Sequence, residues 1–247
     1  MSLHFKGPLL ADSNAGVFAN YPISLVQLPV HRALYVNDFD KEADYNTTTW
    51  TIANITGGAA PTLAAVTITT TLSIITLNAG TDTARGIYVR PATGFASTDL
   101  NTQSFAMEFR SRVGPGANAD GFHFIGLSSA VPLKTTGALE TTFSGLGLYI
   151  NYATLTTNLV LQIGTGVIVN AALPVTPSSY NRYGIRFDLK TATAGVLSFY
   201  QNGIKYYEAA VATTSFAPAF PSLTSVCASA DSSCGLSVDY IALAMTR

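Results

Sequence analysis

The stretch VLSFYQNGIKYYEAAV, residues 196–211, decides the fold class of this 247-residue chain. Two runs rich in aromatic and β-branched residues flank Asn202-Gly203, a dipeptide that tolerates positive φ at both central positions of a type I′ turn. The stretch therefore predicts a β-hairpin, in which facing aromatic side chains add up to about 1 kcal/mol per pair. The pairs expected across it are Tyr200 with Lys205 and Phe199 with Tyr206.

The period-two alternation of this hairpin recurs along the chain. Apolar and charged residues alternate in residues 105–113 and again in 185–189, which is typical of half-buried strands. LVLQIGTGVIVNAAL, residues 159–173, predicts a second hairpin that turns at Gly164-Thr165-Gly166. Further strand candidates are Leu72–Leu77, Gly86–Val89, Gly121–Leu127, Leu146–Tyr152 and Gly235–Met245.

These strands are short, their turn signals are almost regularly spaced, and no convincing helix pattern interrupts them. Such a succession is typical of a sandwich or a barrel, and we expect one all-β, antiparallel β-sandwich over residues 31–247. Residues 235–245 are apolar on both faces. That strand is therefore either central in a sheet or covered by a neighbour on its outer side.

Residues 1–30 differ from the rest, because three prolines separate isolated aromatic residues there. Proline blocks regular strand pairing, so we expect an extended N-terminal arm. Its apolar anchors would be Phe5, Phe18 and Tyr21, which would contact a partner subunit. The alternative is a loop that folds back on its own domain.

The charge pattern excludes some partners. Only 11% of the residues are charged, the net charge is −1, and the sequence shows no cluster of lysines and arginines. Nucleic-acid binding needs a basic patch and is not expected. The apolar runs are far shorter than the roughly 20 residues that span a membrane, and the start MSLHFKGPLL lacks the pattern of a secretory signal. The low charge indicates either a large core with a Thr/Ser surface or an outer surface covered by partners.

Two cysteines, Cys227 and Cys234, flank the segment ASADSS. A disulfide is geometrically possible if their Cβ atoms face each other. Without a sign of secretion, two reduced thiols are the expectation.

No pattern in the chain predicts catalysis, a cofactor or a metal. His123 follows Asp120 by three residues and alternates with Phe122 and Phe124, so its side chain should point away from both rings. A nucleophile is missing beside it, and we expect a histidine on the surface or at a sheet edge.

The carboxylates give no paired-acid motif either. Glycosidases need two acids across a cleft, but Glu108 and Asp188 stand alone on the polar sides of their strands. The densest acidic stretch, NDFDKEADY at residues 37–45, is expected to be a solvated strand end. Trp50 and the tyrosines fit a β core, and they fit a glycan-stacking surface as the alternative.

The order of several motifs resembles the concanavalin A-like jelly-roll virion proteins of tailed bacteriophages, often described as head decoration or minor structural proteins. The resemblance covers about residues 45–247. The segments that carry it are Gly80-Thr81-Asp82, residues 105–110 (FAMEFR), residues 124–127 (FIGL), Asn202-Gly203 and Val238-Asp239-Tyr240-Ile241.

This resemblance implies an antiparallel jelly-roll β-sandwich of the concanavalin A-like lectin/glucanase type. It also implies a non-enzymatic capsid decoration, or cement, protein on the surface of the virion, made in the host cytoplasm. Its partners would be the major capsid protein and further copies of itself, as a dimer or trimer. The alternative is a glycan-binding virion module, a head fibre or adhesin of the same fold. An enzyme of that fold that cleaves polysaccharides is the third possibility, and it would need the paired acids.

Overall fold

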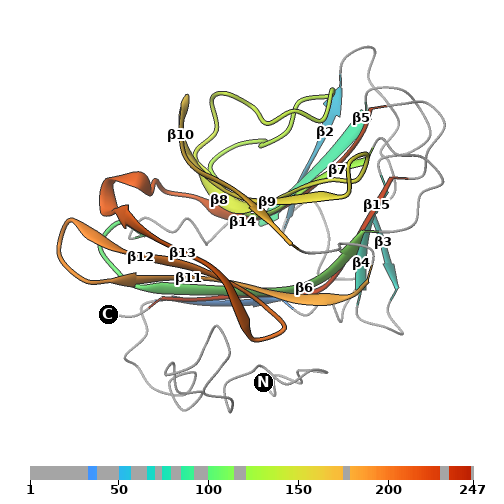
Figure 1. The fold of residues 1–247 in the computed structure, drawn as a ribbon. Helices are drawn as coiled ribbons and strands as arrows, with labels where there is room; N and C mark the ends of the chain where they lie inside the picture. The colour runs from blue at the N-terminus through green and yellow to red at the C-terminus, as the bar shows by residue number, and fades with distance from the viewer. Residues whose placement is uncertain are drawn as a thin grey trace.

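The computed structural model describes residues 33–37, 50–56, 66–69, 74–78, 85–91, 100–113, 121–174, 179–228 and 234–245. These residues form fifteen strands in two antiparallel sheets that pack face to face (Figure 1). The arm anchors Phe5, Phe18 and Tyr21 lie outside the described residues. The described residues contain no helix that is long and apolar enough to cross a membrane.

The chain passes repeatedly from one sheet to the other. The strands of sheet A are β1 (Ala33–Asn37), β3 (Val66–Thr69), β4 (Ile74–Asn78), β6 (Phe105–Val113), β11 (Asn181–Leu189), β12 (Ala194–Gln201), β13 (Ile204–Ala212) and β15 (Gly235–Met245). Those of sheet B are β2 (Trp50–Thr56), β5 (Arg85–Pro91), β7 (Gly121–Ser128), β8 (Gly145–Asn151), β9 (Thr156–Ile163), β10 (Gly166–Leu173) and β14 (Phe220–Cys227). A short 3-10 helix, Thr213–Ser215, precedes β14.

Sheet A runs in the order β13-β12-β11-β6-β15-β4-β3, and sheet B in the order β10-β9-β8-β7-β14-β5-β2. The apolar strand at residues 235–245 is central in sheet A, which is one of the two placements expected for it. It pairs with β6 along one side, and with β4 and then β1 along the other. A strand with neighbours on both sides exposes no unpaired backbone groups.

The hairpin at residues 196–211 is confirmed, with one correction to its register. Asn202 and Gly203 both have positive φ, 50° and 85°, and Tyr200 lies opposite Lys205. Phe199, however, lies opposite Tyr207 and not Tyr206, because a β-bulge follows Phe199. A bulge places two residues of one strand against one of the other, which leaves Tyr206 43% exposed.

The main core fills the space between the two sheets. Every second residue of a strand points its side chain into this space. Its largest fully buried side chains include Phe105, Phe109, Tyr183, Phe187 and Phe199. Phe187 contacts Phe216 with ring centroids 4.6 Å apart. Aromatic contacts of this kind add about 0.5–1.5 kcal/mol beyond the area that they bury.

A disulfide joins the two sheets, which corrects the expectation of reduced thiols. Cys227 ends β14 in sheet B, Cys234 directly precedes β15 in sheet A, and their Cα atoms are 5.5 Å apart. Both cysteines are buried. Their spacing alone did not show whether the two side chains faced each other, because that depends on how the two sheets stack.

Candidate ligand-binding face

The side of sheet B that turns away from sheet A is concave (Figure 1). Along β7, Ile125 and Leu127 point into the main core, so Phe122 and Phe124 point to the concave side. The segment between β7 and β8, residues 129–144, lies on this side and is called the β7–β8 loop below. It determines which parts of the concave side remain accessible.

The β7–β8 loop packs onto the sheet as a second, smaller core. Leu133 and Phe143 are fully buried against Phe124, Tyr88 and Val226, which come from three different strands. The ring centroids of Phe124 and Phe143 are 5.6 Å apart in an edge-on contact. Apolar side chains of the loop therefore cover the middle of the concave side.

The base of the loop is closed by backbone hydrogen bonds, and its tip rests on two aromatic rings. Ser129 N–H donates to Ser144 O at 2.8 Å. At the tip, Gly137 has φ of +81°, a conformation that favours glycine. A Cβ atom there would lie 2.0 Å from the Phe122 ring, and the Tyr149 hydroxyl donates to Gly137 O at 3.1 Å. These contacts place the tip directly beside Tyr149.

The far end of β9 also lies under the loop. Gln162 Nε2 donates to Glu140 O and Gly164 O, each at 2.8 Å, and Val160 is fully buried. The open part of the concave side therefore begins at the next outward-facing residue of β9, Asn158.

That open part holds five polar side chains with outward-facing positions on three neighbouring strands. They are called the Asn–Tyr patch here: Tyr149, Asn151, Thr156, Asn158 and Asn170. Tyr149 lies opposite Asn158 and Asn151 opposite Thr156 in the pairing of β8 with β9. Asn158 Nδ2 donates to Asn170 Oδ1 at 2.6 Å, which joins β9 to the edge strand β10.

Each member of the Asn–Tyr patch is at least partly accessible. Thr156 and Asn170 are exposed, and the other three are half-buried. The Tyr149 ring also lies 6.5 Å from the Phe122 ring, with their planes at 18°. Burial raises the pKa of the Tyr149 hydroxyl, so this group donates its hydrogen bond throughout the neutral pH range.

Charged groups are scarce on the concave side. The seven strands of sheet B contain no Asp or Glu, and their only charged residues are Arg85 and Arg90, both in β5. The Arg90 guanidinium lies 4.4 Å from the centre of the Phe220 ring. Buried hydroxyls also lie on this side of the sheet: Ser128 donates to Ser222 at 2.7 Å, and Tyr88 contacts Ser128 at 3.4 Å.

The two lone carboxylates of the sequence lie on the outer side of sheet A and are not brought together. Glu108 accepts a hydrogen bond from the Tyr240 hydroxyl at 2.5 Å, and its burial raises the pKa of the carboxyl group. Asp188 pairs with Arg186 at 2.8 Å. Glu108 lies opposite Gly184, four residues along β11 from Asp188. Within the described ranges no three His, Cys, Asp or Glu residues form a possible metal site.

His123 corrects a third expectation. Its side chain points away from Phe122 and Phe124, as predicted, but that side is the main core and not the surface. The residue is fully buried, and burial lowers its pKa to about 3. Neither ring nitrogen has a hydrogen-bond partner among the described residues. The sequence suggested a surface position because a polar residue that alternates with aromatic residues in a strand usually faces solvent. However, β7 is central in its sheet and is covered on both faces.

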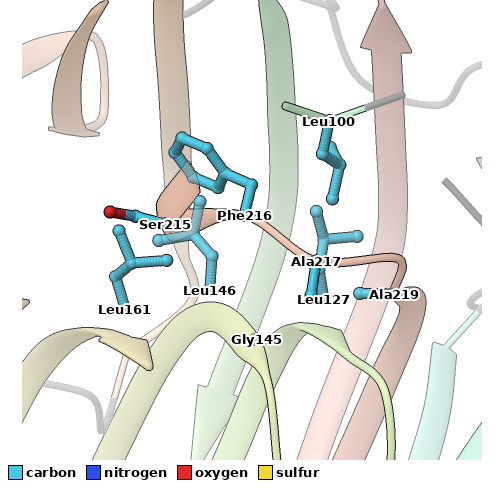
Figure 2. Close-up of a pocket in the computed structure, with 9 residues that line it drawn as sticks. All are labelled: Leu100, Leu127, Gly145, Leu146, Leu161, Ser215, Phe216, Ala217 and Ala219. Atoms are coloured by element: carbon cyan, nitrogen blue, oxygen red, sulfur yellow. The ribbon is translucent and has the colours of Figure 1, made fainter. Parts of the chain in front are cut away.

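One small pocket opens at an end of the main core (Figure 2). Leucine, alanine and phenylalanine side chains line most of it, and Ser215 is the single hydroxyl residue. The volume of about 10 Å³ is close to the minimum for one water molecule. The pocket is therefore too small to hold a ligand, and the Asn–Tyr patch is the better candidate.

The sequence analysis missed the Asn–Tyr patch. Its asparagines, at positions 151, 158 and 170, occur once in each of three consecutive strands. That recurrence was the available signal. It becomes a site only when the strand register places the side chains next to one another.

The chain resembles known proteins in its fold. No family model matches the chain, and no curated protein matches it either. An endo-1,3-beta-glucanase from Streptomyces sioyaensis is 14% identical with a TM-score of 0.60, over 89% of this chain and 98% of that one. A legume lectin-like domain from Entamoeba histolytica is 8% identical with a TM-score of 0.57, over 85% and 95%.

A third structure covers the full length of the chain. It is a protein of unknown function from Shewanella oneidensis MR-1, 11% identical with a TM-score of 0.56, over 100% of this chain and 97% of that one. Together with the two antiparallel sheets, these similarities confirm the predicted fold: the chain is a jelly-roll β-sandwich of the concanavalin A-like lectin/glucanase type.

Proposed function

We propose that this protein binds carbohydrate without cleaving it, and that the Asn–Tyr patch is the binding surface. The observation that carries the proposal is the joined pair Asn158–Asn170 beside the half-buried Tyr149 ring. Side-chain amides supply both donors and acceptors for sugar hydroxyls. An aromatic side chain supplies an apolar surface for the C–H groups of a sugar ring, with a polar group at its edge.

The absence of carboxylates from sheet B supports a role in binding. Hydrolysis of a glycosidic bond uses two carboxyl groups about 5–10 Å apart on either side of the bond. None of the seven strands beneath the concave side carries an Asp or Glu. The β7–β8 loop contains a single acid, Glu140. The similarity to lectins and glucanases supports the fold, and the proposed ligand rests on the patch itself.

The test is binding to a glycan array followed by calorimetric titration of each hit. We expect the double variant Asn158→Ala, Asn170→Ala to lose binding while its melting temperature stays close to that of the parent chain. Gln201→Ala, on β12 in sheet A, is the matched control and should bind like the parent. Retained affinity in the double variant, or cleavage of a bound glycan, would contradict the proposal.

A second candidate function is that of a decoration protein on a phage capsid. The observation that favours it is a set of exposed apolar side chains at the tips of two edge hairpins. Val167 and Ile168 are 55% and 48% exposed at the start of β10, and Ile204 is 60% exposed at the start of β13. Covering such side chains with a protein partner would remove apolar surface from water. The partners would be major capsid subunits and further copies of this chain, with the virion surface as the location.

The capsid proposal is tested by co-sedimentation with assembled capsids. Interface energy is concentrated in a few buried apolar side chains. We therefore expect attachment to weaken when Val167 and Ile204 are replaced by Ser, and to weaken further when residues 1–30, with Phe5, Phe18 and Tyr21, are removed. If each variant attaches as tightly as the parent chain, neither the edge hairpins nor the arm bind the capsid.

A further inference from the structure

We infer that the Asn–Tyr patch recognises the end of a short, uncharged glycan and not the interior of a long chain. This inference rests on the proposed function and specifies its ligand. Two features of the structure carry it: the β7–β8 loop stops the patch on two sides, and the patch contains no charged side chain.

The first feature limits the length of the ligand across the strands. Adjacent strands lie about 4.8 Å apart, so the three strands β8, β9 and β10 span about 10 Å. At β8 the loop tip closes this path, because Tyr149 is hydrogen-bonded to Gly137 O and the Phe122 ring packs against Gly137. A chain that crosses the strands from the β10 edge therefore ends at Tyr149.

The loop also limits a ligand that runs along β9. Two residues beyond Asn158, Val160 is fully buried, and beyond it Gln162 is held by Glu140 O in the loop. Since β10 is an edge strand, the patch opens past Asn170. One end of a glycan can thus lie on the patch while the rest of the chain leaves over β10.

The second feature selects the chemistry of the sugar. Tyr149, Asn151, Thr156, Asn158 and Asn170 are all uncharged at neutral pH, so none of them pairs with a carboxylate or sulfate. A sulfated or uronic-acid glycan would keep its counterions, because no cation of the patch replaces them. A neutral hexose needs only the amide, hydroxyl and aromatic groups that are present.

The test is a titration of the full chain with linear neutral glucans in matched series, from disaccharide to decasaccharide, together with the parent polysaccharides. If the patch binds the end of the glucan, the dissociation constant per mole of glucan molecules should be the same for every glucan length. Affinity per mole of sugar would then fall in proportion to length. A constant affinity per mole of sugar would overturn the inference and leave the proposed function intact, whereas no binding by any glucan or arrayed glycan would overturn both.

Two further measurements sharpen the result. Binding should be unchanged between low and high salt, and an affinity for heparin or polygalacturonate that falls steeply with salt would overturn the neutral assignment.

The single variant Asn170→Ala should weaken the binding of the disaccharide about tenfold, which corresponds to the loss of one or two hydrogen bonds. Gln201→Ala should leave that binding unchanged. Weakening of long chains alone would show that Asn170 contacts the chain interior, and this too would overturn the inference.

Discussion

The outer side of sheet A and the concave side of sheet B handle polar groups in opposite ways. On sheet A charges are paired with one another: Arg110 with Asp239, Arg186 with Asp188 and Lys205 with Glu208. On sheet B the strands lack carboxylates, and a loop with apolar side chains covers the centre. Both solutions keep a sheet face stable, and the second leaves uncharged amides and an aromatic ring at its margin.

The difference matters because paired charges satisfy each other. Surface ion pairs are worth little in energy, yet they leave few unpaired groups for a ligand. The Asn–Tyr patch retains hydrogen-bonding capacity, since an amide has two donors and an acceptor with two lone pairs. The following changes test whether the two sides differ in this way.

The largest expected effect comes from the β7–β8 loop. Phe143→Ala removes a fully buried ring that contacts Phe124, and should lower the free energy of unfolding by about 3–5 kcal/mol. Urea denaturation measures the change. Tyr206→Ala, at an exposed position of sheet A, is the control and should change stability by less than about 0.5 kcal/mol. Similar small effects at both sites would mean that the loop is not a second core.

The next effect concerns the bond that joins the two sheets. Replacing Cys227 and Cys234 together by Ser removes a crosslink between residues seven apart in sequence. Loop-closure entropy predicts a loss of about 2.5 kcal/mol in the free energy of unfolding. Thermal unfolding with and without reductant checks it. The parent chain should melt lower under reduction, and the double variant should not respond to the reductant.

The third effect, ranked by its size over a single pH unit, is a dependence of stability on pH that originates in His123. Its pKa is about 3 when folded and about 6.5 when unfolded, so between these values the unfolded state binds the additional proton. The contribution of neutral His123 to the free energy of unfolding should be fully present above pH 6.5. It should fall by about 1.4 kcal/mol per pH unit as the pH decreases toward 3.

Denaturation of the parent chain and of His123→Leu at several pH values measures this slope. The difference in stability between the two proteins should depend on pH only within that window. A difference that stays constant from pH 7 to pH 4 would contradict the buried, neutral state of His123.

The smallest effect tests the polar network of sheet A. Tyr240→Phe removes the hydrogen bond to Glu108 and should lower the free energy of unfolding at neutral pH by about 1 kcal/mol. It should also raise the pKa of Glu108 further, because that hydrogen bond opposes the effect of burial.

The titration of Glu108 can be followed by the NMR signal of its carboxyl carbon. Because burial raises the folded pKa, the contribution of Glu108 to stability is present at low pH and is lost as the pH rises through that value. This dependence is opposite to that of His123. Glu108→Gln should abolish it, and an unchanged pH profile in that variant would assign the effect to another group.

The sequence by itself determined the fold class and many of the strands. Alternation located residues 105–113 and 185–189, and Asn202-Gly203 specified its turn, because side-chain period and positive φ are local properties. The strand at residues 235–245 was predicted with its observed bounds. Apolarity on both of its faces reflects a central position, which local sequence also records.

Only the tertiary structure decided which residues that are distant in the sequence contact one another. A bulge moved the partner of Phe199 by one residue, the stacking of the sheets joined Cys227 to Cys234, and coverage on both faces placed His123 in the core. The Asn–Tyr patch likewise depends on the register of three strands and on a loop that stops beside Tyr149. Register and sheet stacking arise from contacts between residues far apart in sequence, so no local pattern specifies them.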